Sequence, residues 1–470
     1  MNRWRSLCIV LEPFETIEPA LECLRWPIYR YHISQEQLVP TGAKAWLMQA
    51  RRCFFSIREK ASDHQKKSPL WFALHGSTPS HLLPFQAVMH EMAERDLTGL
   101  AVGPFPYETL SLDKGWRQVP LDIGFPEAGL ILFNCLYKKA CAYAPDLRKA
   151  LLETGLWPEA QAPSLNILTD WIWTALRLDW DIAQRLQRYT PRVLVLGSDL
   201  GFLRNPLARH ARALGAYTLV LQHGLQGEYA GSVSTNEVSL WGEYHRRQTV
   251  ELGAPPKALV VDGSPRMDTI LKLVNDPATR ASARKTLNIP QDAPVILHIS
   301  DGINRMKKSY PEITDRFLKD APLAFCAISR EAIYLIRPHP IENDSDWSFL
   351  ETKDNIRIIP KNQMGLYDLI AAADVVTVIL SAGGLEAIWC SKPVLFYQPV
   401  DVPPVHNFVA TGGGLAIRNS LEWADMALSL VRDHLAQVKQ VENTADFCAD
   451  TLAFPGQASQ KVVDRIEQHL

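Results

Sequence analysis

A glycine pair behind an apolar run is the strongest chemical signal in the sequence. The segment VVTVILSAGGLEAIWCSKPVLFY (375–397) predicts a buried strand, a turn at Ser381 with Gly383 and Gly384, and then a helix. Glycines let the backbone approach an anion closely, and the N–H groups and dipole of a helix start favour phosphate. Glu386, early in the helix, would accept hydrogen bonds from a ribose or sugar hydroxyl. The alternative is a tight turn in which Glu386 only complements the helix dipole.

An arginine and a histidine follow another apolar strand, in IYLIRPHP (333–340). The prolines after Arg337 and after His339 restrict the backbone, so both side chains project in defined directions. Arginine and histidine suit a diphosphate or a departing phosphate. A histidine that is satisfied within its own loop is the structural alternative.

The first half of the chain repeats this strand-end pattern. Ser198 and Asp199 follow one apolar strand, and Gln222, His223 and Gly224 follow the next. A histidine after a buried strand that faces a cleft is a candidate general base or ligand-orienting group. A purely structural role for His223 stays open.

A loop near residue 75 adds further polar side chains. WFALHGSTPSHLLPFQAV places His75, Ser77 and His81 where a loop opens a helix. Together with Asp199 they are our candidates for the acceptor side of a site, and ordinary loop capping is the alternative reading.

Carboxylates supply the remaining candidates. Asp301, in HISDG, ends a strand and is either a cleft residue or part of a plain turn. Asp344-Ser345-Asp346 has a metal-binding form, but helix capping explains it more simply. The motifs GxGxxG, GxxxxGK[ST], GxSxG and HExxH are absent, so hydride-transfer enzymes, nucleotide hydrolases, serine esterases and zinc proteases lose their usual markers. No pattern in the sequence requires a metal or a cofactor.

Short apolar runs alternate with helical segments, which is typical of parallel α/β layers. Ten strands are predicted, at 71–75, 98–103, 192–197, 217–222, 258–263, 294–300, 333–338, 356–360, 375–380 and 393–397. We therefore expect an α/β fold with two Rossmann-like, doubly wound domains that face a cleft, preceded by an N-terminal extension. The expected boundaries are 1–66 for the extension, 67–264 for an acceptor domain, 265–456 for a nucleotide-donor domain and 457–470 for a closing helix.

Three segments outside this rhythm carry their own predictions. Residues 6–12 predict a strand and residues 41–61 a helix. Residues 168–186 carry three tryptophans at near-helical spacing, which indicates either a core helix or a membrane-surface helix. We favour the core helix, because Asp170, Asp179 and Asp181 would face anionic lipid unfavourably.

Charge and composition exclude several classes of protein. The 470 residues include 49 basic and 51 acidic side chains, so a nucleic-acid partner has no electrostatic support. Eight cysteines without a CxxC pair indicate reduced thiols. The sequence shows neither a signal peptide nor an apolar run long enough to span a membrane. We expect a cytoplasmic protein, either free or peripheral to the inner membrane.

Four motifs, taken in their order along the chain, resemble those of a known family. They are QHG (222–224), GSPRMD (263–268), RPHP (337–340) and SAGGLEA (381–387). The chain thereby resembles the GT-B glycosyltransferases of bacterial surface carbohydrates over most of residues 70–470. The same order is similar to that in capsule polysaccharide transferases, HP-motif polysialyl- and Kdo-transferases, and CDP-glycerol glycerophosphotransferases.

The resemblance implies a nucleotide-activated donor bound by the second domain and a metal-independent transfer. His339 would contact the donor phosphate, Ser381 to Gly384 would cradle it, and Glu386 would hold a hydroxyl. His223 would match a histidine proposed as base or acceptor contact. Asp301 stands where sialyltransferases keep an acidic pair, but the first position here is Ser300, which weakens a catalytic role for Asp301.

The non-hydrolysing UDP-N-acetylglucosamine 2-epimerases are also similar in fold and motif order. The chain reads GLQGEYAG and STNEVSLW where these epimerases carry acidic EAGLR and EExNR blocks, so the bases for proton abstraction are missing. We expect a glycosyltransferase that uses a nucleotide sugar, with CMP-sugar or CDP-type donors favoured, and a glycan or lipid-linked acceptor. The epimerase and a non-catalytic partner protein of the same fold are the alternatives.

Overall fold

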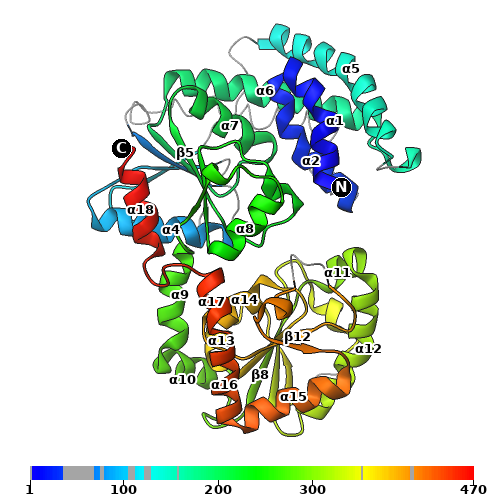
Figure 1. Ribbon diagram of the computed structural model, residues 1–470, viewed down its shortest axis with the longest axis vertical. Coiled ribbons are helices and arrows are strands. Elements are labelled where there is room, and N and C mark those ends of the chain that lie inside the picture. Colours follow the sequence, from blue (N-terminus) through cyan, green and yellow to red (C-terminus); the bar gives the residue numbers. More distant parts are fainter. Residues whose placement is uncertain are drawn as a thin grey trace. The chain divides into compact units, whose positions relative to one another are not determined.

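The computed structural model describes residues 3–34, 68–74, 79–103, 112–120, 129–155, 158–350, 353–402 and 407–470. The chain divides into two compact units. The first unit comprises Met1–Trp241, His245–Arg266 and Gln457–Leu470, and the second comprises Gly242–Tyr244 and Met267–Gly456. Each unit is an α/β domain built on one parallel sheet (Figure 1).

The sheet of the first unit has the order β3-β2-β1-β4-β5-β6-β7, with every neighbouring pair parallel. Its strands are β1 (Leu70–Ala73), β2 (Leu100–Gly103), β3 (Arg117–Pro120), β4 (Val193–Leu196), β5 (Tyr217–Leu221), β6 (Glu237–Leu240) and β7 (Leu259–Val261). Strand order reverses between β1 and β4. In open α/β sheets this switch point, at the carboxyl ends of the strands, is where ligands bind.

The first unit has helices on both faces of its sheet and further helices that pack on those helices. They are α1 (Arg3–Ile17), α2 (Arg25–Ser34), α4 (Pro79–Glu94), α5 (Gly129–Glu153), α6 (Leu165–Arg188), α7 (Gly201–Ala213), α8 (Glu243–Glu251) and α18 (Ala458–Glu467), with short helices η1 (Pro19–Leu24), η3 (Glu159–Gln161), η4 (Glu228–Gly231) and η5 (Pro256–Ala258). Side chains alternate across a strand. Accordingly Leu70 and Phe72 pack against α4 and α18, while Trp71 and Ala73 pack against α6 and α7.

The predicted strand over 6–12 is wrong, because these residues belong to helix α1. Trp4, Leu7 and Leu11 recur at helical spacing, and all three are buried against η1, α2, α5 and α6. The predicted helix over 41–61 lies outside the described residues. The core helix predicted over 168–186 is confirmed as α6, where Trp171 is fully buried.

The sheet of the second unit has the order β10-β9-β8-β11-β12-β13, again entirely parallel. Its strands are β8 (Val295–Ile299), β9 (Ile333–Arg337), β10 (Ile356–Ile358), β11 (Val375–Val378), β12 (Val394–Tyr397) and β13 (Leu415–Ile417). Its switch point lies between β8 and β11. Thus all ten predicted strands are present, and β3, β6 and β13, which are short, are additional.

The helices of the second unit are α9 (Pro265–Asn275), α10 (Pro277–Thr286), α11 (Ile303–Ser309), α12 (Pro311–Ile328), α13 (Leu366–Ala372), α14 (Ala382–Trp389), α15 (Ser420–Arg432), α16 (His434–Asn443) and α17 (Ala445–Thr451), with η6 (Asp344–Trp347) and η8 (Val409–Thr411). Helices α12 and α15 bury an aromatic core that includes Phe317 and Trp423 against one sheet face.

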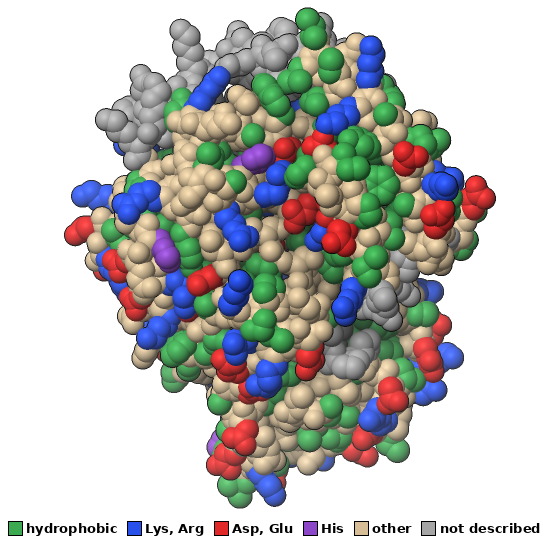
Figure 2. Space-filling view, turned by 45° about the horizontal axis from the view of Figure 1, so that its top comes forward, with side chains coloured by type: hydrophobic (Ala, Val, Ile, Leu, Met, Phe, Trp, Pro, Cys, Tyr) green, Lys and Arg blue, Asp and Glu red, His purple; other side chains and the backbone are tan. Residues whose placement is uncertain are grey.

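On the face of the chain shown in Figure 2, basic and acidic side chains are interspersed. None of the helices in the described ranges is long and apolar enough to span a membrane.

Candidate functional site

Asp301 joins the two strands at the switch point of the second unit. It follows β8, and its buried carboxylate accepts hydrogen bonds from the backbone N–H groups of Ile379 (3.1 Å) and Leu380 (3.2 Å), which follow β11. Burial raises the pKa of Asp301 to about 6, although these N–H donors oppose the shift. Because the donors occupy the carboxylate, Asp301 positions the turn that leads into Ser381.

Glu342 likewise holds the loop after β9 in position through hydrogen bonds. It was not among the site residues predicted from the sequence. It is buried, and its Oε1 accepts from the Ser300 hydroxyl (3.0 Å) and the Ile303 N–H (2.7 Å), while its Oε2 accepts from the His339 N–H (2.5 Å). The loops after β8 and β9 are therefore fastened together. The available signal was an acidic residue directly behind a proline-rich strand end.

His339 is held in a defined orientation and tautomer. Its Nδ1 accepts a hydrogen bond from the Ile341 N–H (3.2 Å), so its proton is on Nε2, which becomes a donor. Burial, together with the positive charges of Arg305 and Lys361, lowers the pKa of His339 to about 4. An anion beside His339 would meet one N–H donor and two cationic side chains.

Arg337 takes a different position from the one expected. Its guanidinium donates to the carbonyl oxygens of Pro360 (3.0 Å) and Lys361 (3.2 Å), behind β10. These bonds make Arg337 a support for that loop. Arg305, which is exposed and donates to the Asp301 carbonyl oxygen (2.7 Å), is the arginine whose charge acts on His339.

Ser381 caps the start of α14, as its Oγ accepts from the Gly383 N–H (3.1 Å). The two glycines, however, face the sheet. A Cβ on Gly383 would lie 3.1 Å from a methyl group of Ile299, and a Cβ on Gly384 would lie 2.8 Å from one of Val378. Close packing of helix against strand thus accounts for the glycine pair.

Glu386 is buried within α14, and its Oε2 accepts a hydrogen bond from the hydroxyl of Tyr367 (3.0 Å), on α13.

The Asp-Ser-Asp sequence (344–346) lies in η6, where Asp346 and Asn343 form a capping box, as the simpler reading predicted. Across the described ranges, no group of three or more histidine, cysteine, aspartate or glutamate side chains could hold a metal ion.

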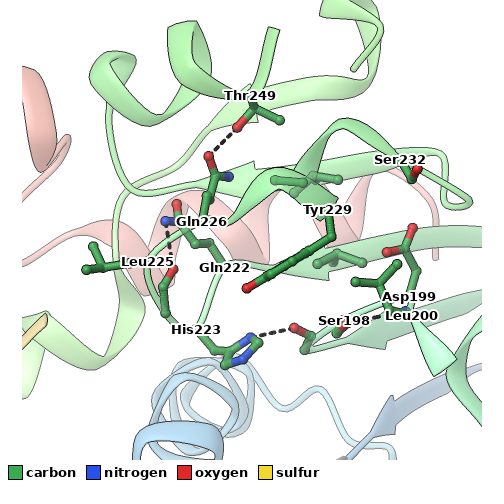
Figure 3. A pocket seen from close by; sticks show the side chains of 15 residues that line it. Ser198, Asp199, Leu200, Gln222, His223, Leu225, Gln226, Tyr229, Ser232 and Thr249 are labelled. Carbon is green, nitrogen blue, oxygen red and sulfur yellow. Dashed lines mark hydrogen bonds between the residues drawn. The ribbon is translucent and has the colours of Figure 1, made fainter. Parts of the chain in front are cut away.

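His223 lies behind β5 in the first unit and borders a cavity of about 80 Å³ (Figure 3). Its Nδ1 lies 2.7 Å from the Gly197 carbonyl oxygen, behind β4. Its ring meets that of His81 edge-on, with centroids 5.0 Å apart. Burial lowers the pKa of His223 to about 3, and neighbouring His81 contributes. The ring is therefore neutral.

The neighbouring predicted residues have mainly supporting contacts. Gln222 accepts from the Trp241 N–H (3.0 Å) and so fixes the strand end that carries His223. Asp199 is buried and accepts from the Ser234 N–H (2.6 Å), and burial raises its pKa to about 6. Ser198 accepts from the Leu200 N–H (3.2 Å). His75 and Ser77 lie outside the described residues.

Comparison with models of known protein families finds no match. A search of curated protein sequences finds no similar sequence either. Solved structures do share the fold. A wall teichoic acid polymerase, TagF, in a variant form soaked with CDPG, has 12% sequence identity and a TM-score of 0.52, over 91% of this chain and 95% of its own. A protein from Listeria monocytogenes assigned as a UDP-N-acetylglucosamine 2-epimerase has 13% identity and a TM-score of 0.55, over 86% and 97%. At these identities the likeness establishes the two-domain GT-B fold.

Proposed function

We propose that this chain is a glycosyltransferase that moves a sugar from a nucleotide-activated donor to a surface polysaccharide or glycoconjugate. The observation that carries the proposal is the fixed His339 ring, whose Nε2–H lies at the carboxyl edge of the second sheet within the fields of Arg305 and Lys361. Asp301 and Glu342 fasten the three loops around it. A rigid donor group flanked by cations suits a phosphate that gains charge as it departs.

In the proposed reaction the donor phosphate lies against His339, Arg305 and the start of α14. The bond between the anomeric carbon and the phosphate oxygen breaks, and the nucleotide leaves with the electron pair. The acceptor hydroxyl forms the new bond to the anomeric carbon. Its proton goes to Nε2 of His223, which carries the lone pair because Nδ1 is bonded to Gly197. The reaction needs no metal or cofactor besides the donor.

Cytidine donors, CMP-sugar or CDP-type, come first among the candidates. The RPHP sequence (337–340) and the TagF fold neighbour, whose structure was solved with CDPG, support this choice. The acceptor would be a glycan or a lipid-linked glycan, with the enzyme in the cytoplasm, free or peripheral to the inner membrane. A role in capsule polysaccharide synthesis is consistent with such an acceptor.

An epimerase is the second candidate, since an assigned 2-epimerase shares the fold. Epimerisation needs a base to remove a proton from carbon. Among the residues that line the cavity beside His223, Asp199 is the one carboxylate, and its Oδ2 is bonded to the Ser234 N–H. This arrangement favours transfer.

A thermal-shift panel of CMP, CDP, UMP, UDP and GDP tests the donor assignment. Ligand at a hundredfold excess over Kd should stabilise the native state by about 2.7 kcal/mol. We expect one base to raise the melting temperature of the wild type, His339→Ala to lose the shift, and His434→Ala, an exposed histidine of the same unit, to keep it. If no nucleotide gives a shift, the non-catalytic alternative takes precedence. Conversion of UDP-N-acetylglucosamine without an acceptor would instead establish the epimerase.

A further inference from the structure

The cavity beside His223 has an aromatic wall that the proposed reaction does not use. Tyr229, in η4, lines the cavity together with parts of the loops after β4 and β5. In Figure 3 the Tyr229 ring crosses the cavity, and its hydroxyl points to the side on which His223 lies. Burial raises the pKa of this hydroxyl, so it keeps its proton and remains a donor.

Three aromatic side chains from the N-terminal helices hold the Tyr229 ring. The centroid of Tyr229 lies 4.9 Å from that of Trp26, 6.2 Å from that of Trp4 and 6.4 Å from that of Tyr29, each in an edge-to-face arrangement. Trp26 and Trp4 do not line the cavity themselves. They act on it through Tyr229, as edge-to-face pairs fix ring orientation.

Hydrogen bonds fasten the same helices to η4. The indole N–H of Trp4 donates to the Ser232 hydroxyl (2.9 Å). The Glu228 carboxylate, next to Tyr229 in the sequence, accepts hydrogen bonds from the backbone N–H of Trp4 and from the Tyr29 hydroxyl (both 3.4 Å). Residues 3–34 therefore support the segment around η4 that lines one side of the cavity, although they are far from His223 in the sequence.

The size and lining of the cavity select a small hydroxylated group. About 80 Å³ holds several water-sized groups, since one water needs at least about 10–15 Å³. A nucleotide is much larger. Around this space stand the Tyr229 ring and hydroxyl, the His223 ring and Gln226, whose Oε1 accepts from Thr249 and whose amide N–H₂ is the donor. An aromatic face with amide, phenol and imidazole groups matches alternating C–H and O–H groups.

We infer that this cavity is the subsite for the terminal sugar or polyol of the acceptor, in which Tyr229 positions the reacting hydroxyl against His223. The N-terminal helices α1 and α2 then support the acceptor site by fixing the Tyr229 ring. The inference rests on the proposed transferase function, since it names the acceptor chemistry of that reaction.

Saturation-transfer NMR of the full chain tests the subsite directly. The probes are the methyl pyranosides of glucose, galactose and N-acetylglucosamine, and glycerol. We expect one of them to receive saturation from the wild type. Tyr229→Leu should abolish the signal, Tyr229→Phe should weaken it, and Trp26→Leu should raise Kd about 2- to 10-fold by loosening the ring. Tyr137→Phe, an exposed tyrosine of α5, is the matched control.

Each outcome decides the inference. A pyranoside signal assigns a sugar terminus, and a signal from glycerol alone assigns a polyol terminus. The inference is overturned if no probe binds, or if Tyr229→Leu, with a wild-type circular dichroism spectrum, binds the probe as well as the wild type. If Tyr229→Leu does not fold, Tyr229→Phe serves instead. The nucleotide shift separates the two proposals, because it depends on the second unit and should persist in every Tyr229 variant.

Discussion

The Nδ1 atom of His223 lies 2.7 Å from the carbonyl oxygen of Gly197. A carbonyl only accepts, so Nδ1 carries the proton and Nε2 carries the lone pair. Gly197 follows β4 and His223 follows β5. Thus two neighbouring parallel strands set the tautomer of the candidate base, just as the Ile341 N–H sets the opposite tautomer of His339.

Replacing His223 should remove the base without removing the donor site. His223→Ala should lower kcat about 10²- to 10⁴-fold, the usual contribution of a general base, and should leave the nucleotide thermal shift unchanged. Because the pKa of His223 is about 3, the acid limb of kcat/KM should show no inflection near 6.5 from this residue. Steady-state rates from pH 5 to 8 provide the measurement. His90→Ala, at a largely exposed histidine of α4, should behave as the wild type. Wild-type turnover by His223→Ala would refute the assignment of the base.

Asp301 should prove to be a positioning residue. Asp301→Ala leaves the Ile379 and Leu380 N–H groups unsatisfied in a buried place, which should lower the free energy of unfolding by about 2–4 kcal/mol. Asp301→Asn keeps one acceptor oxygen, so its turnover should stay within about tenfold of the wild type, whereas loss of a base costs at least about 10². Urea unfolding and initial rates distinguish these outcomes.

The pH dependence of Asp301→Asn gives an independent readout. The folded pKa of about 6 is raised by burial, so the ionised form is disfavoured in the fold. The stability that Asp301 contributes is present below its unfolded pKa and is lost as pH rises through about 6. The variant does not ionise, so its stability relative to the wild type should increase from pH 4 to pH 7. A constant difference over that range would show that the buried carboxyl does not titrate.

Several features of the fold follow from local patterns in the sequence. The ten predicted strands are short apolar runs whose type is decided by residues close in the chain. The two switch points, in contrast, depend on the order of the strands in the folded sheets. Residues 6–12 were misassigned because a short apolar run fits either a strand or a buried helix. What decides between them is packing against α5 and α6, more than a hundred positions later.

The candidate site was harder to predict, because side-chain partners are long-range. The position of Arg337 at a strand end is visible in the sequence, but its acceptors, the carbonyl oxygens of Pro360 and Lys361, depend on the next strand. Glu342 looks like an ordinary loop carboxylate until its three donors from two loops are seen. The orientation of the Tyr229 ring depends on contacts with the distant N-terminal helices.

His298 should make the second unit sensitive to acid. This residue of β8 is fully buried, its Nδ1 lies 3.0 Å from the Thr377 hydroxyl, and in the described part of the chain its Nε2 has no hydrogen-bond partner. Burial lowers its pKa to about 3. The unfolded chain, with a histidine pKa of about 6.5, binds the proton more readily. The contribution of His298 to the free energy of unfolding should therefore fall by about 2 kcal/mol from pH 7.5 to pH 5.

His298→Phe should remove the contribution of His298 to the pH dependence of stability. A phenyl ring keeps the aromatic contacts with Phe317, and the Thr377 hydroxyl retains its hydrogen bond with Tyr334 (2.9 Å). Urea unfolding at pH 5 and pH 7.5 should give a smaller difference for the variant than for the wild type. The raised carboxyl pKa values of Asp301 and Asp199 and the lowered pKa values of His223 and His339 act in both proteins and cancel in the comparison. Equal pH dependence in variant and wild type would rule out His298 as its source.

The glycine pair of α14 offers a test of packing against ligand approach. A Cβ on Gly384 would lie 2.8 Å from a methyl group of Val378, on β11. Gly384→Ala should therefore destabilise the chain by about 1–3 kcal/mol through overpacking. Val378→Ala removes that methyl group. The double variant should therefore lose less free energy of unfolding than the two single variants lose together, by at least about 0.5 kcal/mol. Gly224→Ala, where a Cβ would meet nothing within 4 Å, is the control and should change stability little.

If Gly383 and Gly384 are instead required for close approach of a phosphate, Gly384→Ala should weaken nucleotide binding at unchanged stability, and Val378→Ala should not restore the binding. Urea unfolding of the wild type and the four variants, together with the nucleotide thermal shift, separates the two explanations.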